Sequence, residues 1–176
     1  MPNHVIDARA DRLTLAAHWT LGGIAVGTLD LAFAWAFWQP HGVGLARILQ
    51  SISAGVLGNA SFNGGLATVA LGAGLHYFIA CMFVVAYFLA SLRVAALRRR
   101  PVACGLAYGV LLYLVMNFVV LPLSATGLPD FGNVPWVASS VVMHAVFGLM
   151  CGLCVRWSAI RAEAMPTRAD APPTPV

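Results

Sequence analysis

Four long stretches of the chain contain almost no charged residue, and this feature restricts the possible folds more than any other. A helix needs about 20 residues to cross a hydrocarbon core of ~30 Å. The stretches that reach this length lie at residues 19–38, 66–89, 102–123 and 134–155. Because lipid offers no hydrogen-bond partner to the backbone, such stretches cross it as helices. The sequence therefore predicts an all-α integral membrane protein built as a four-helix bundle.

The composition supports this class and excludes others. Only 9% of the residues are charged and 60% are apolar, whereas about a quarter of a soluble sequence is charged. The net charge of +4 comes from ten Arg residues with no Lys, which lie mostly in short flanking segments. A nucleic-acid-binding protein instead carries a basic patch on a folded soluble surface. We therefore expect a lipid bilayer, and no nucleic acid, as the partner.

The Arg residues also predict the orientation. Nine of the ten lie before the first span, between the second and third, or after the fourth, and only Arg47 lies on the other side. Basic residues favour the cytoplasmic side, so both termini are expected in the cytoplasm, and the Arg-only composition favours a bacterial inner membrane. The predicted organisation is a cytoplasmic segment (1–15), a transmembrane domain (16–157) and a cytoplasmic, Pro-rich, disordered tail (158–176).

Tryptophans bracket the first and fourth spans and favour positions at the two membrane interfaces. These residues are Trp19, Trp38, Trp136 and Trp157, with Trp35 one turn inside Trp38.

The connection between the first two spans contains a predicted amphipathic helix at residues 45–58. Its apolar face consists of Leu45, Ile48, Leu49, Ile52 and Val56. Its polar face consists of Arg47, Gln50 and Ser51, and Gly58 is suited to end it. We expect this helix in the outer interface, as a cover over the mouth of the bundle or as a re-entrant gate or docking element.

Each span carries one stripe of small residues, because residues four apart share a helix face. Such stripes let membrane helices approach closely. The residues predicted to pack helices are Gly23, Gly27, Gly72, Gly105, Gly109, Gly148 and Gly152.

A polar residue falls on each stripe and should therefore point into the bundle. The four are Asp30, His76, Asn117 and His144. Asp30 and His144 each lie eight residues from a bracketing Trp, so both are expected ~12 Å below the outer interface. An intramembrane carboxylate costs on the order of 2.5 to 3.5 kcal/mol. That cost predicts a partner or a use for Asp30.

Three interpretations of this cluster stay open. In the first, Asp30 is neutral or paired, and the network only fixes helix register. In the second, the carboxylate and imidazoles titrate protons or bind a small polar or cationic ligand. In the third, His76 and His144 bind haem as in a b-type cytochrome; no other metal site and no other cofactor is expected.

The sequence contains no recognisable catalytic motif. The C-x-x-C formed by Cys151 and Cys154 lies on an apolar helix without the positive surroundings that activate thiols. We therefore expect packing cysteines and a non-enzymatic protein.

Several segments between Gln50 and Thr126 resemble a set of small bacterial four-span proteins and, more distantly, the YagU-like inner-membrane proteins. They are the block from Gln50 to Gly58, His76 with Tyr87, the Gly105 to Gly109 segment, and the residues from Asn117 to Ser124 around Pro122. The YagU-like pattern has a histidine where this chain has Asn117. The resemblance implies a multi-span inner-membrane protein and no particular activity.

The function expected from the sequence is that of an accessory or structural membrane subunit, as a homo-oligomer or within a larger complex. A transporter of protons or small solutes, built on the Asp/His cluster, is the alternative.

Overall fold

The prediction of an all-α four-helix bundle is confirmed. The computed structural model describes the backbone of residues 3–164 and the side chains of residues 17–158, and helices are the only regular elements in that part of the chain. Most of the predicted tail lies outside the described residues. Four helices are long and apolar enough to cross a membrane: Ala17–His41, Gly65–Arg93, Pro101–Leu123 and Val134–Ser158. The chain is therefore a multi-pass membrane protein.

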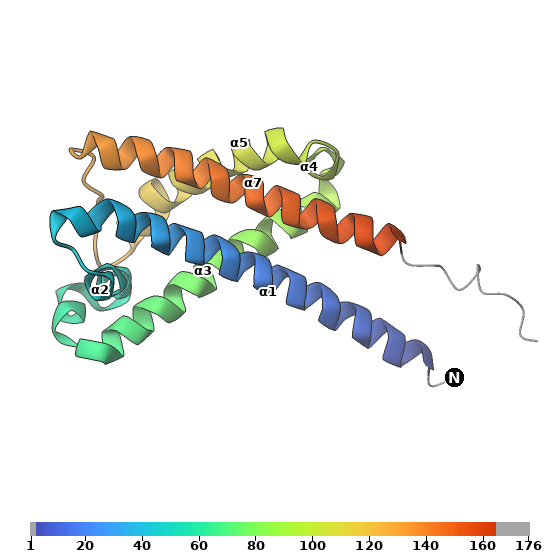
Figure 1. Cartoon of the computed structure of the whole chain (residues 1–176), viewed down its shortest axis with the longest axis horizontal. Coiled ribbons are helices and arrows are strands. Elements are labelled where there is room, and N and C mark those ends of the chain that lie inside the picture. Colours follow the sequence, from blue (N-terminus) through green and yellow to red (C-terminus); the bar gives the residue numbers. More distant parts are fainter. Residues whose placement is uncertain (1–2, 165–176) are drawn as a thin grey trace, which may run out of the picture.

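The helices run up and down the long axis of the molecule (Figure 1). Helices α1 (Asn3–Trp38) and α7 (Val134–Ala164) lie side by side, while α3 (Gly65–Arg93) crosses behind α1. Helix α5 (Pro101–Val115) packs chiefly on α7. Both α1 and α7 extend beyond the predicted spans, so the first residues expected in the tail are helical. The start of α1 and the end of α7 lie at the same end of the bundle.

Two short helices mark the two ends. Helix α2 (Leu45–Leu57) lies across one end, joined to α1 by the 3-10 turn η1 (Gln39–His41) and to α3 by the 3-10 turn η2 (Gly58–Asn63). Helix α4 (Ala95–Arg99) connects α3 to α5 at the other end. We call these the α2 end and the α4 end.

The contact between α5 and α7 is a ladder of glycines at four-residue spacing. A Cβ atom on Gly105 would meet the backbone of Gly148, and one on Gly109 would meet the backbone of His144 and Ala145. Lipid tails give no hydrophobic drive to helix association, so close backbone packing is what holds this pair together.

The other predicted packing glycines also lie against neighbouring elements. Gly23 faces Cys81, Gly27 faces Tyr77 and Ala80, Gly72 faces the carbonyl of Leu49, and Gly152 faces Pro101.

The packed core lies in the half of the bundle nearer α4. Its fully enclosed side chains include Val84, Tyr87, Phe147 and Cys151. The Tyr87 hydroxyl donates a hydrogen bond to the Leu97 carbonyl (3.1 Å), which ties α3 to α4. Its polar end is therefore satisfied inside an apolar core, as buried tyrosines require.

The face of α2 that packs on the bundle differs from the expected one. Ile48 and Leu49 are buried as predicted, but Val56 is 63% exposed, and the small residues Ser53 and Ala54 are buried instead. The reason is the close approach of the Leu49 backbone to Gly72, which brings a face of small residues against α3. Helix α2 ends at Leu57 and is capped by Gly58, the residue that the sequence predicted to end it. The φ of +58° at Gly58 is accessible to glycine without strain.

The predicted third span is not one uninterrupted α-helix but three consecutive helical elements. After α5 the chain forms a π-helical turn, η3 (Met116–Val120), and then the short helix α6 (Leu121–Leu123). Pro122 lacks the N–H that would bond to the carbonyl four residues before it, and a wider turn is one way in which a helix adjusts to this loss. The periodicity of the sequence did not predict this turn.

Candidate functional site

A half-open cavity of about 550 Å³ lies in the half of the bundle nearer α2. Helices α1, α2, α3 and α7 and the turn η3 all contribute to its wall. The volume falls within the range of about 300–1,000 Å³ that is typical of small-molecule sites. All four residues of the predicted polar cluster, Asp30, His76, Asn117 and His144, line this one cavity.

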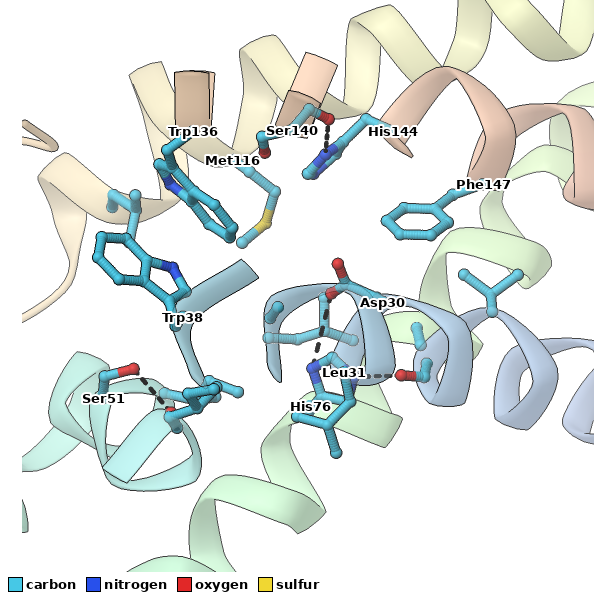
Figure 2. Close-up of a pocket in the computed structure, with 18 of the residues that line it drawn as sticks. Asp30, Leu31, Trp38, Ser51, His76, Met116, Trp136, Ser140, His144 and Phe147 are labelled. Atoms are coloured by element: carbon cyan, nitrogen blue, oxygen red, sulfur yellow. Dashed lines mark hydrogen bonds and ion pairs between the residues drawn. The ribbon is translucent and has the colours of Figure 1, made fainter. Parts of the chain in front are cut away.

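Asp30 and His76 form the pair at the base of the cavity. The His76 Nδ1 atom lies 3.9 Å from a carboxylate oxygen of Asp30. The side chain of Asp30 is 36% exposed and that of His76 only 10%, so the carboxylate faces the cavity while the imidazole lies against α1. Asp30 lies between the two imidazoles (Figure 2).

The tautomer of His76 follows from its second contact. Its Nε2 atom lies 2.7 Å from the Gly27 carbonyl oxygen. A carbonyl only accepts hydrogen bonds, so Nε2 carries the proton in the neutral ring and Nδ1 is the acceptor nitrogen. In the neutral imidazole, the Nδ1 lone pair therefore faces the acidic side chain.

His144 is held in the opposite tautomer. Its Nδ1 atom lies 2.8 Å from the Ser140 carbonyl oxygen one turn earlier on α7, so Nδ1 donates and Nε2 titrates. The ring packs edge-on against Tyr113 of α5, with ring centroids 5.4 Å apart.

Asn117 reaches the cavity from the π-turn η3. Its Nδ2 atom donates a hydrogen bond to the Tyr113 carbonyl (2.9 Å), and its side chain is half-buried. Such turns often occur at functional sites. Met116 of the same turn also lines the cavity (Figure 2).

The wall towards the α2 end is aromatic. The indole rings of Trp38 and Trp136 pack with centroids 5.3 Å apart, and both line the cavity. Phe33 stacks on Trp136, with ring centroids 5.5 Å apart. The sequence placed these two tryptophans at the interface, and in the structure they also pack on each other across α1 and α7.

The cavity also reaches Arg47 of α2, whose guanidinium lies 3.7 Å from the centre of the Phe62 ring. This cation–π contact holds the charge beside an aromatic ring of η2. A backbone hydrogen bond from Ala125 to the Gly55 carbonyl (2.9 Å) fastens α2 to the loop after α6. Helix α2 therefore crosses this end of the cavity and is held there by its contacts with η2 and with the loop after α6.

Sequence reasoning missed the parts of the site outside the polar stripes: Trp38, Arg47, Phe62, Met116 and Trp136. The isolation of Arg47 was a usable signal, because it is the one Arg on its side of the predicted topology. The sequence predicted the helix at residues 45–58 and a cover over the mouth of the bundle as one of its roles, but it did not predict which α2 residues line the cavity.

The histidines do not suit haem in this arrangement. Both ring nitrogens of His76 face protein oxygens, which leaves neither free for an axial bond to iron. Within the described residues, no group of three His, Cys, Asp or Glu side chains has the geometry of a metal site.

The cysteines are placed as packing residues. Cys151 is fully buried in the core, and the Cys154 Sγ atom lies 3.8 Å from the His18 carbonyl. The residues between them continue the α7 helix without a break.

Comparisons with family models, with curated proteins and with solved structures found no significant match. The resemblance to the YagU-like proteins therefore stays a prediction, and the argument for function depends on the cavity itself.

Proposed function

We propose that this membrane protein is non-enzymatic and binds a small solute in its cavity, with exchange of a proton at Asp30, His76 and His144. The observation that carries the proposal is the Asp30–His76 pair within a half-open cavity. A pair that served only to fix helix register would need no cavity beside it, whereas a carboxylate that faces a cavity can exchange a proton and contact a ligand.

The proton balance of the pair supports this proposal. Because Nε2 of His76 donates to Gly27, its Nδ1 atom and the Asp30 carboxylate would face each other as two acceptors if no proton were present. A proton on either partner removes this repulsion. A ligand that donates to the carboxylate supplies the same stabilisation, so ligand and proton compete.

The orientation belongs to the same proposal. The excess of Arg near both termini and near α4 favours the cytoplasm for the α4 end, in a bacterial inner membrane. The cavity would then lie in the outer half of the bilayer.

An accessory or structural role, as a homo-oligomer or within a larger complex, stays the alternative prediction. Exposed apolar side chains on α5, such as Leu111 and Leu114, suit lipid and a protein partner equally. A structural role does not require a cavity lined by a carboxylate, and for this reason we favour ligand binding.

The test is a nitrogen NMR titration of ¹⁵N-histidine-labelled protein in lipid nanodiscs between about pH 5 and pH 8. We expect Asp30→Asn to change the curves of both His76 and His144, because both rings face Asp30. Asp130→Asn, in the loop before α7, is the matched control and should change neither. If Asp30→Asn leaves both histidine curves as they are, the three groups share no proton and the proposal fails.

A further inference from the structure

The polar side chains at the base of the cavity share one property: each uses an N–H donor on a backbone carbonyl. His76 donates to Gly27, His144 to Ser140, and Asn117 to Tyr113. Each neutral imidazole then keeps only an acceptor nitrogen, and the amide keeps its carbonyl oxygen. Together with the Asp30 carboxylate, the base of the cavity is rich in acceptors.

The charge of the residues that line the cavity also favours a ligand rich in hydrogen-bond donors. Among the residues that line the cavity, all within the described part of the chain, Asp30 is the only acidic one. The charged groups facing it from the packed elements are His76 on α3, His144 on α7 and Arg47 on α2, while η3 contributes the uncharged Asn117. Arg47 keeps its charge but lies on Phe62 of η2, at the α2 end of the cavity, and the two imidazoles are uncharged in their neutral tautomers. With its proton lost, the base of the cavity therefore carries one negative charge.

The remaining wall suits an apolar group with an aromatic or alkyl part. Trp38 and Trp136 form one side with Met116 next to Trp136, and Leu31 lies near Asp30 and His76 (Figure 2). Indole faces also attract cations through the ring quadrupole. An apolar wall above an acceptor-rich, negatively charged base matches a molecule with an apolar body and a cationic, donor-rich end.

We infer that the cavity binds an amphipathic primary or secondary amine in its ammonium form. The N–H groups donate to Asp30 and to the acceptor nitrogen Nε2 of His144, and the apolar part packs against Trp38 and Trp136. An ammonium group has donors and no acceptor, so it complements this base where a hydroxyl or a carboxylate does not. The inference rests on the proposed function, because the amine replaces the shared proton, which leaves for solvent.

The experiment uses three probes that share a phenyl ring on a two-carbon arm and differ in the charge at its end. They are phenethylammonium, neutral 2-phenylethanol and anionic phenylacetate. The full-length protein is placed in nanodiscs of phosphatidylcholine, which has no net charge. Binding is followed by calorimetry, and proton release by a pH indicator in weak buffer. Phenethylammonium should bind most tightly, should release a proton, and should bind more tightly as pH rises because protons compete for Asp30.

The variants identify the carboxylate. Asp30→Asn should weaken phenethylammonium binding by about tenfold or more and abolish proton release, which is the effect of losing one charge-assisted contact. Asp130→Asn should match the wild type. Equal binding of 2-phenylethanol, preference for phenylacetate, or cation binding that Asp30→Asn leaves intact would each overturn the inference.

The two proposals fail in different ways. If Asp30→Asn changes both histidine curves but the protein shows no preference for the ammonium probe, the proton site stands and the assigned ligand class is wrong. If the histidine curves are independent of Asp30, the proposed function itself is wrong. If Asp30→Asn does not fold, the order of the three probes on wild-type protein still decides the ligand class.

Discussion

The two histidines of the site differ in which ring nitrogen a backbone carbonyl holds, and this difference can be measured. His76 uses Nε2 and His144 uses Nδ1. Both contacts lie in the hydrogen-bond range, and a carbonyl cannot donate. At a pH where both rings are neutral, ¹⁵N NMR should therefore show the Nε2–H tautomer for His76 and the Nδ1–H tautomer for His144. His76→Gln assigns the signals, and an Nδ1–H tautomer at His76 would contradict the contact with Gly27.

Individual residue positions show what periodicity can predict. The polar residues at Asp30, His76, Asn117 and His144 each lie on a stripe of small residues, and all four line one cavity. Helical spacing was sufficient here because packing between membrane helices selects small residues and so marks the inward face. The hydrogen-bond partners could not be predicted, since a carbonyl on another helix, such as that of Gly27, depends on the relative height of two helices.

At the scale of helices, the α5–α7 ladder should be sensitive to single methyl groups. A Cβ on Gly109 would meet the backbone of His144 and Ala145, whereas one on Gly74 of α3 meets no atom within 4 Å. Gly109→Ala should therefore destabilise the protein by about 1–3 kcal/mol, as overpacking does. Gly74→Ala, also within a helix, should be neutral or stabilising because alanine favours helix.

Thermal unfolding of the two variants in the same detergent measures this difference. Equal melting temperatures would show that α5 and α7 are not in backbone contact.

The position of α2 predicts an effect on ligand entry. Arg47 lies where α2 crosses the cavity, so its charge should repel an approaching ammonium ion. Arg47→Gln should raise the association rate constant of phenethylammonium by about two- to fivefold, and the effect should shrink at high salt. Stopped-flow tryptophan fluorescence measures this rate. Arg93→Gln, near the α4 end, is the control, and an equal response to it would assign the effect to net charge alone.

Two elements show where sequence reasoning stopped. For α2, the hydrophobic pattern placed Val56 on the packed face, but the backbone contact between Leu49 and Gly72 selected Ser53 and Ala54. For the third span, Pro122 is compatible with a kink, a break or a wider turn. Tertiary packing selects among these, and a single sequence does not contain that information.

At the scale of the whole molecule, four membrane-crossing helices require both ends of the chain to lie on one side. The Arg distribution predicts that this side is the cytoplasm. A reporter enzyme that is active only outside the cytoplasm should be inactive when fused after residue 176 and active when inserted at residue 127, in the loop before α7. The reverse pattern would place the cavity in the cytoplasmic half. Equal activity at both sites would contradict an even number of crossings.

The bundle is packed in one half and hollow in the other. The sequence predicted the number of spans from the lengths of the apolar stretches and their alternating direction from the distribution of Arg residues. The hollow half could not be predicted, because a void depends on how far apart α3 and η3 lie once α2 and the π-turn are in place.

His76 touches α1 at two places, the carbonyl of residue 27 and the carboxylate of residue 30, which are three residues or ~4.5 Å of rise apart. The two contacts of this one imidazole on α3 therefore fix the position of α1 along the bundle axis. If α1 slid along α3 by a full turn, the ring would meet the carbonyl near Gly23 and lose the acid altogether. A ligand or proton that binds at Asp30 therefore also changes the resistance of α1 to sliding along α3. The chemistry of the site and the alignment of these two helices are coupled.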